Sequence, residues 1–146
     1  MYSPWGQIDY VDQIEPGLSW VSTPSHGGLR VSKAYAQKNL SIPARDAGID
    51  YAGYLWYEED CDWAIVALER PRLWGYFFKY SKYANQPDVW YDEILATVKF
   101  WCVKYARLKG LYKPGDKFNC YHPPYHQGIV AENDGLVCGV CWERLP

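Results

Sequence analysis

Residues 22–28 form the first group whose types and spacing could carry out chemistry. They have the sequence STPSHGG, in which His26 precedes two glycines. This composition favours a tight turn that exposes the imidazole beside backbone amides. Such amides can bind an anion or stabilise an oxyanion, and an imidazole can transfer a proton near neutral pH. His26 is therefore a candidate catalytic residue, and the alternative is a turn histidine that only bonds a neighbouring carboxylate.

A run of acidic residues near position 60 could complete such a site. Glu58, Glu59 and Asp60 follow one another directly. In one cleft with His26, Glu58 and Glu59 could serve as catalytic acid–base partners in a small hydrolase or nuclease-like enzyme. The carboxylates could also hold a hard divalent cation. This enzyme hypothesis requires the imidazole and the carboxylates to meet around an open pocket.

Cys61 follows these acids and offers a second chemical interpretation, a cysteine hydrolase with His26 as its base. Two features argue against it. The neighbouring acids would raise the pKa of the thiol, and Cys61 shares an apolar helical stripe with Ile65 and Leu68. We therefore expect Cys61 to point into the core.

Cysteines and histidines also gather near the C-terminus in the order C-x-H-x3-H-x11-C-x2-C, at Cys120, His122, His126, Cys138 and Cys141. Zinc prefers four such ligands in a tetrahedral arrangement, so Cys120, His122, Cys138 and Cys141 form one candidate zinc site. The alternative is buried cysteines and surface histidines, because a strand would place Cys138 and Cys141 on opposite faces. No other cofactor is expected, since the sequence has no phosphate-binding glycine loop, dinucleotide fingerprint, nucleophile elbow or H-E-x-x-H motif.

Residues 70–83, RPRLWGYFFKYSKY, interleave cations with aromatic rings. Exposed tyrosine and tryptophan ringed by charge are typical of protein-binding surfaces. We expect such a surface to include Arg70, Arg72, Trp74, Tyr76 and Tyr80. The same combination can bind single-stranded nucleic acid through base stacking and phosphate contacts. A buried aromatic element would have the same composition, so all three interpretations stay open.

The composition of the 146-residue chain limits the classes of protein it can be. With 49% hydrophobic and 18% aromatic residues it can form a packed core, which excludes disorder. Fifteen Lys and Arg against seventeen Asp and Glu are too balanced for a basic DNA coat or an acidic DNA mimic. Five cysteines, an odd number, argue against a disulfide framework. We expect a cytoplasmic protein without a membrane partner, because no signal peptide or spanning segment is recognisable.

A single α+β domain spanning residues 1–146 is expected to position these groups. Residues 7–14, 18–23 and 29–32 are rich in β-formers and separated by turns, which predicts an N-terminal antiparallel sheet. Residues 33–40 predict a short helix. The proline and glycines of residues 41–53 predict a loop over the fold.

Two main helices are expected to pack against this sheet. The first spans residues 56–69, with its acids in the first turn and Pro71 at its end. The second spans residues 88–109, with Asp88 as its N-cap and Gly110 closing it. Its apolar stripe consists of Tyr91, Ile94, Val98, Trp101, Tyr105 and Leu108. Residues 73–80 suit either a buried strand or a helix, and residues 135–145 a final strand that returns to the sheet.

Two sequence strings, WVSTPSHGGLRVS at residues 20–32 and WYEEDCDWAIVAL at residues 56–68, together resemble a known domain family. This uncharacterised family occurs in bacterial mobile elements, phages and plasmids, both as small proteins and within large polyvalent proteins injected with the DNA. The resemblance covers roughly residues 3–95 and includes a looser match at residues 87–93. The cysteine- and histidine-rich tail lies outside it. The resemblance implies no established activity, but it suggests accessory work in the host cytoplasm, such as evasion of restriction or CRISPR systems.

Two functional hypotheses follow from these observations. In the first, the chain is a binding protein that blocks a host defence complex through protein contacts and performs no turnover. In the second, it is a small hydrolase or nuclease-like enzyme that uses His26 with the carboxylates between Glu58 and Asp62. We expect the first, and the distance from the imidazole to the carboxylates discriminates between them.

Overall fold

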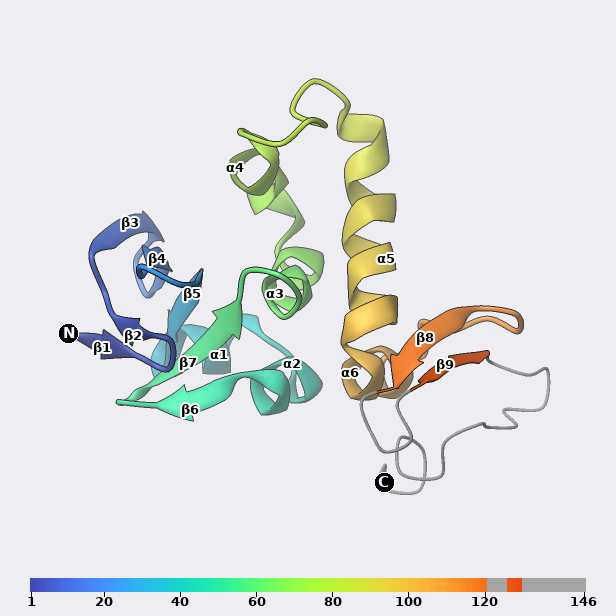
Figure 1. The fold of residues 1–146 in the computed structure, drawn as a ribbon, viewed down its shortest axis with the longest axis horizontal. Helices are drawn as coiled ribbons and strands as arrows, with labels where there is room; N and C mark the ends of the chain where they lie inside the picture. The colour runs from blue at the N-terminus through green and yellow to red at the C-terminus, as the bar shows by residue number, and fades with distance from the viewer. Residues whose placement is uncertain (121–125, 130–146) are drawn as a thin grey trace.

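The computed structural model describes residues 1–120 and 126–129 and confirms the α+β class. Its largest sheet has five antiparallel strands in the order β3-β4-β5-β7-β6 (Figure 1). These strands are β3 (Tyr10–Glu15), β4 (Leu18–Ser22), β5 (Gly27–Ser32), β6 (Ile49–Tyr51) and β7 (Tyr54–Glu58). Two short strands, β1 (Tyr2–Ser3) and β2 (Gly6–Gln7), pair with each other in a separate antiparallel sheet.

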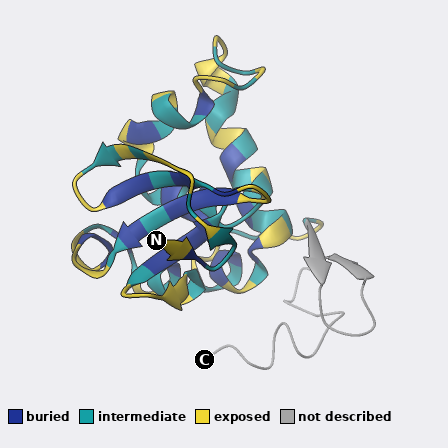
Figure 2. Ribbon diagram, turned by 60° about the vertical axis from the view of Figure 1, so that its left-hand side comes forward, coloured by how far each residue is buried: buried dark blue, intermediate teal, exposed yellow. Residues whose placement is uncertain are grey.

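Strand register gives this sheet two distinct faces. Trp20 pairs with Leu29, and Leu29 pairs with Tyr57, so these three side chains share one face. Leu29 and Tyr57 are fully buried there in the main core. On the opposite face the buried ring of Trp56 meets the edge of Trp5, with ring centroids 5.9 Å apart. Figure 2 shows buried positions along the central strands and on the inner sides of the helices.

Helices cover the core face of the sheet and extend away from it (Figure 1). In chain order they are α1 (Lys33–Asn39), α2 (Ile42–Ala47), α3 (Trp63–Glu69), α4 (Trp74–Phe78), α5 (Trp90–Trp101) and α6 (Val103–Leu108). Two single 3-10 turns, η1 (Pro71–Leu73) and η2 (Pro87–Val89), precede α4 and α5. Among the described residues, no helix combines the length and apolarity that a bilayer crossing requires.

The expected helix over residues 56–69 is wrong in its first part, because Tyr54–Glu58 is strand β7 and helix α3 begins only at Trp63. The β-forming residues Leu55, Trp56 and Tyr57 are all buried between β5 and β6. The acids that follow therefore lie in the connection from β7 to α3. Pro71 does end this helix, as expected.

The expected loop over residues 41–53 is also wrong, since it contains α2 and β6. Ser41 caps α2 by accepting a hydrogen bond from the backbone N–H of Ala44. Pro43 lies in the first turn of that helix. A proline is tolerated there because the backbone N–H that it lacks would have no acceptor within the helix. The short helix over residues 33–40 is confirmed as α1, which the side chain of Ser32 caps.

The long helix expected over residues 88–109 is divided into α5 and α6 at Cys102, whose backbone leaves the helical region (φ −112°, ψ 61°). Its expected N-cap is wrong, because Val89 occupies that position and Asp88 lies within η2. Gly110 does close the segment, with a φ of +65° that favours glycine. Residues 73–80 form the helical turns of η1 and α4 instead of a strand.

The described strands at the C-terminal end form a separate hairpin. β8 (Lys117–Cys120) pairs with β9 (His126–Ile129), and this two-stranded sheet does not join the five-stranded one. It lies beside the C-terminal part of α5 (Figure 1). The strand expected over residues 135–145 lies outside the described residues.

Candidate functional site

His26 and the acidic residues do meet in space. His26 lies in the turn before β5, Glu58 ends β7, and Glu59 and Asp60 follow it. The His26 Nδ1 atom is 3.7 Å from Glu58 Oε1. One potential ligand atom from each of the four residues lies within 4.8 Å of the others. The imidazole is half exposed and the Glu58 carboxylate is 22% exposed, so the cluster is open to solvent.

Thr23 fixes the backbone on which His26 sits. Its buried hydroxyl accepts the N–H of His26 at 3.0 Å and donates to the carbonyl of the same residue at 2.7 Å. The backbone N–H of Thr23 also donates to that carbonyl, at 2.8 Å. The main chain of His26 is thus held on both sides, while its side chain remains free to contact other groups.

The two glycines after His26 are not part of the turn, contrary to the sequence-based expectation. Gly27 and Gly28 are buried and begin strand β5. A Cβ atom at Gly28 would lie 2.2 Å from the Tyr57 carbonyl oxygen and 2.7 Å from Trp5. Gly28 pairs with Glu58, so this close approach of two strands is what brings His26 beside the acids.

The thiol of Cys61 is not suited to nucleophilic catalysis. Burial raises its pKa well above the usual range, and the carboxylates of Asp62 and Glu58 raise it further. Its Sγ atom lies 3.2 Å from Glu58 Oε2, to which it donates. Burial likewise raises the pKa of Cys102, whose thiol lies 3.7 Å from Asp62. Both thiols are therefore kept protonated, which disfavours the cysteine hydrolase.

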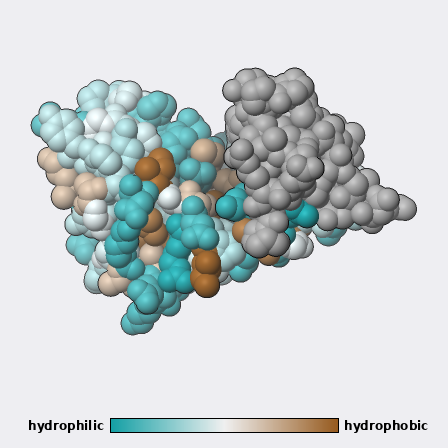
Figure 3. All heavy atoms as spheres, turned by 90° about the horizontal axis from the view of Figure 1, so that it is seen from below, coloured by the Kyte–Doolittle hydropathy of each residue, from teal (hydrophilic) through white to brown (hydrophobic). Residues whose placement is uncertain are grey.

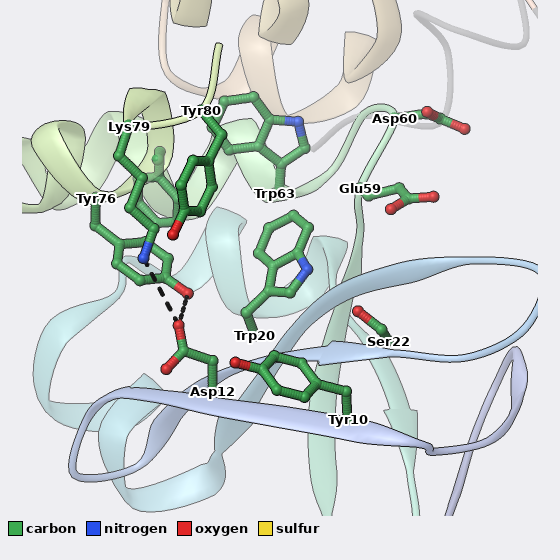
Figure 4. Close-up of a pocket in the computed structure, with 11 residues that line it drawn as sticks. Tyr10, Asp12, Trp20, Ser22, Glu59, Asp60, Trp63, Tyr76, Lys79 and Tyr80 are labelled. Carbon is green, nitrogen blue, oxygen red and sulfur yellow. Dashed lines mark hydrogen bonds and ion pairs between the residues drawn. The ribbon is translucent and has the colours of Figure 1, made fainter. Parts of the chain in front are cut away.

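A groove of about 570 Å³ opens on the core face of the sheet where β3 and β4 meet α3 and α4 (Figure 4). A volume of this size is typical of sites that bind small molecules or peptide side chains. Aromatic rings form most of its wall, with carboxylates and one lysine among them. The lining residues are Tyr10, Asp12, Trp20, Ser22, Glu59, Asp60, Trp63, Tyr76, Phe77, Lys79 and Tyr80.

At one end of the groove, Asp12 forms a hydrogen bond with Tyr76 and an ion pair with Lys79. The phenol of Tyr76 donates to Asp12 at 2.5 Å, and Lys79 Nζ lies 3.8 Å from the same carboxylate. Lys79 Nζ also lies 3.8 Å from the centroid of the Tyr76 ring, a cation–π contact. Burial raises the pKa of Tyr76, and its hydrogen bond to the carboxylate adds to this. The phenol therefore stays protonated and keeps donating.

The five binding residues expected from residues 70–83 do not form one surface. Tyr76 and Tyr80 line the groove, and Tyr80 is 91% exposed. Arg70 and Arg72 instead pair with Glu15, at a smaller pocket of about 350 Å³ beside α1. Trp74 donates its indole N–H to the Ala67 carbonyl at 2.7 Å and contributes to the packing of α3.

Sequence reasoning missed the residues that complete the groove, Tyr10, Asp12, Trp20 and Trp63. Tyr10 and Asp12 alternate along β3, and this period-two pattern was the available signal that they share a face. Nothing local in the sequence indicated that Trp63 would lie across from Trp20, because the two belong to different elements.

The candidate zinc ligands cannot be compared with the structure as a set. His122, Cys138 and Cys141 lie outside the described residues, and Cys120 and His126 are described only as paired backbone positions of β8 and β9. The zinc hypothesis thus stays a prediction.

Seen from below, the described atoms are mainly hydrophilic, with small apolar spots separated by polar side chains (Figure 3). The described part of this face has no broad apolar area of the kind that covers large protein interfaces.

Comparison with known proteins identifies one family. The family model for the Domain of unknown function (DUF7007) matches residues 1–107, which include the sheet, the acidic cluster and the groove. No curated protein and no solved structure shows significant similarity to the chain.

Proposed function

The chain belongs to the DUF7007 family, and we propose that it is a binding protein that blocks a host defence complex for a phage or other mobile element. The resemblance of its two motif strings to domains of mobile elements supports this setting. Restriction and CRISPR systems are the defences that such elements meet in a bacterial cytoplasm. The protein would act by occupying its partner, without turnover.

The aromatic groove is the observation that carries this proposal. Tyrosine and tryptophan are enriched at the centres of protein interfaces, because each gives a large contact area with little loss of side-chain entropy. Tyr80 exposes most of its ring at the mouth of the groove, whereas Trp20 and Trp63 line its wall. A groove with this wall can receive side chains of a partner protein.

Inhibition by stoichiometric binding gives a direct test. Purified chain titrated into purified restriction or CRISPR effector complexes should inhibit DNA cleavage by one of them, with an end point at a fixed molar ratio. Tyr80→Ala should lose roughly tenfold or more in affinity, because it removes an exposed ring at the groove without touching the core. Tyr2→Ala is the matched control, since Tyr2 is 61% exposed and lies outside the groove. Equal inhibition by both variants would refute the groove as the binding surface.

A second candidate function, a metal-assisted hydrolase, is favoured by the approach of His26 to the carboxylates. An imidazole and three carboxylates with atoms within 4.8 Å have the chemistry to hold a divalent cation such as Mn²⁺ or Mg²⁺. A bound cation would acidify a water molecule for attack on an ester or phosphodiester. Glu59 and Asp60 also line the groove, so a substrate there would lie beside the cation.

Calorimetric titration with Mn²⁺ separates this candidate from the first. Binding by the wild type that is lost in His26→Ala, together with Mn²⁺-dependent cleavage of a phosphodiester substrate, would support the hydrolase. If His26→Ala still inhibits the defence complex and the wild type binds no Mn²⁺, the hydrolase hypothesis fails.

A further inference from the structure

The two ends of the groove differ in charge. At one end Asp12 is neutralised by Lys79 and held by Tyr76. At the other end, within the described part of the chain, neither Glu59 nor Asp60 forms an ion pair with a lysine or arginine. Within the described residues, the groove thus offers two carboxylates that pair with no lysine or arginine, next to its aromatic wall.

Two tryptophans of the wall have indole N–H groups that donate to no acceptor in the described residues, Trp20 and Trp63. By contrast, the indoles of Trp56, Trp74 and Trp90 each donate to a backbone carbonyl at 2.7–2.8 Å. Figure 4 shows the nitrogens of Trp20 and Trp63 on the side of their rings that faces Glu59 and Asp60. A ligand in this half of the groove can therefore meet both donors and carboxylates.

The Lys79 end shows how the groove already accommodates a cation. There an ammonium lies over the Tyr76 ring, 3.8 Å from its centroid, and 3.8 Å from the Asp12 carboxylate. The Tyr76 ring and the Asp12 carboxylate together stabilise the positive charge of the Lys79 ammonium. The opposite end repeats these two kinds of group, with Trp20 and Trp63 as rings and Glu59 and Asp60 as carboxylates, but no lysine or arginine of the described residues pairs with them.

We propose that this end of the groove binds an arginine side chain presented by an extended segment of the partner protein. A guanidinium is planar, stacks on aromatic rings and donates in pairs to carboxylates, so it matches both kinds of group. Backbone carbonyls beside the arginine would accept the indole N–H groups. The acidic end repels phosphate, so the charge of the groove favours a basic protein segment over nucleic acid. This inference rests on the proposed binding function and specifies its partner.

The test uses the whole protein, labelled with ¹⁵N, in the presence of a metal chelator that excludes cation binding at the acidic cluster. The probe is a blocked Gly-Ser peptide with one central arginine, and its control carries citrulline, which has nearly the same shape but no charge. The arginine peptide should shift the indole N–H signals of Trp20 and Trp63, assigned by single Trp→Phe variants. The citrulline peptide should bind roughly tenfold more weakly.

Two variants that each remove one negative charge complete the test. Glu59→Gln should weaken arginine-peptide binding about tenfold. Asp46→Asn should not, because Asp46 is exposed and lies outside the groove lining. The inference is overturned if the two peptides bind equally, if neither shifts the two indoles at millimolar concentration, or if a short single-stranded oligonucleotide shifts them instead.

The outcomes also separate this inference from the proposed function. If Tyr80→Ala abolishes inhibition of the defence complex while Glu59→Gln retains it fully, the groove binds the partner but not through an arginine. If the arginine peptide binds and Tyr80→Ala still inhibits fully, the site exists but does not serve the proposed function.

Discussion

Replacing Gly28 by alanine should destabilise the whole sheet. The added Cβ would lie 2.2 Å from the Tyr57 carbonyl oxygen, 2.7 Å from Trp5 and 3.1 Å from the Glu58 Cα. Two of these contacts are with the backbone of the neighbouring strand, which cannot rotate away as a side chain can. Strands β5 and β7 must separate locally, and overpacking of this kind costs about 3 kcal/mol. For a chain of this size that corresponds to a fall of roughly 10 °C in Tm.

Urea denaturation followed by tryptophan fluorescence measures this loss, with Gly75→Ala as the matched control. Gly75 lies within helix α4, and among the described residues no atom beyond its chain neighbours and the backbone of its own helix lies within 4 Å of the position of its added Cβ. Alanine should therefore leave the stability unchanged or raise it by about 0.5–1 kcal/mol, because it favours helix more than glycine does. A Gly28→Ala protein within 1 kcal/mol of the wild type would refute the claim that this close strand approach builds the site.

Three further predictions concern the core and the charged network. Burial raises the pKa of Glu15, but hydrogen bonds from Tyr35 and Arg72 outweigh it and lower the pKa below 4.5. The ionised form thus stabilises the fold above pH 4.5, so Glu15→Gln should cost about 2 kcal/mol at neutral pH. In urea titrations this difference should shrink as the pH falls below 4.5, and a constant difference would contradict it. Cys61 and Cys102 should react with iodoacetamide far more slowly than a free thiol at about pH 8, as their raised pKa values require. Fast alkylation in the native state would contradict the raised pKa values of these two thiols. Ile94→Ala should lose about 3 kcal/mol, since Ile94 is fully buried in the core, and a loss below 1 kcal/mol would show that α5 packs loosely.

The sequence predicted the three strands β3, β4 and β5 well, because alternating apolar residues and the turns between them are local signals. It failed at residues 56–58, where helical spacing of the downstream residues Ile65 and Leu68 suggested an earlier start for the helix. Whether Trp56 and Tyr57 form a strand depends on pairing with Arg30 and Leu29 of β5, which precede them by 26 and 28 positions in the chain. Periodicity within one segment contains no information about that partner.

The candidate site was likewise predictable only where local sequence signals determine it. The approach of His26 to the acids could be anticipated from the composition of the two motifs, although the acids were placed on the wrong element. The reason they meet is the pairing of Gly28 with Glu58, together with the 2.9 Å hydrogen bond from the Glu59 N–H to the Gly27 carbonyl. The groove could not be anticipated, because its wall combines β3, β4, α3 and α4, which only tertiary packing brings together.

Phage plating on bacteria that carry a restriction or CRISPR system tests the central claim most directly. Cells that express the wild-type chain should plate an unprotected phage at higher efficiency than cells without it. Tyr80→Ala should abolish this gain, and His26→Ala should preserve it, because binding through the groove does not require the imidazole. Full protection by Tyr80→Ala combined with loss in His26→Ala would contradict the binding mechanism and favour catalysis at the acidic cluster.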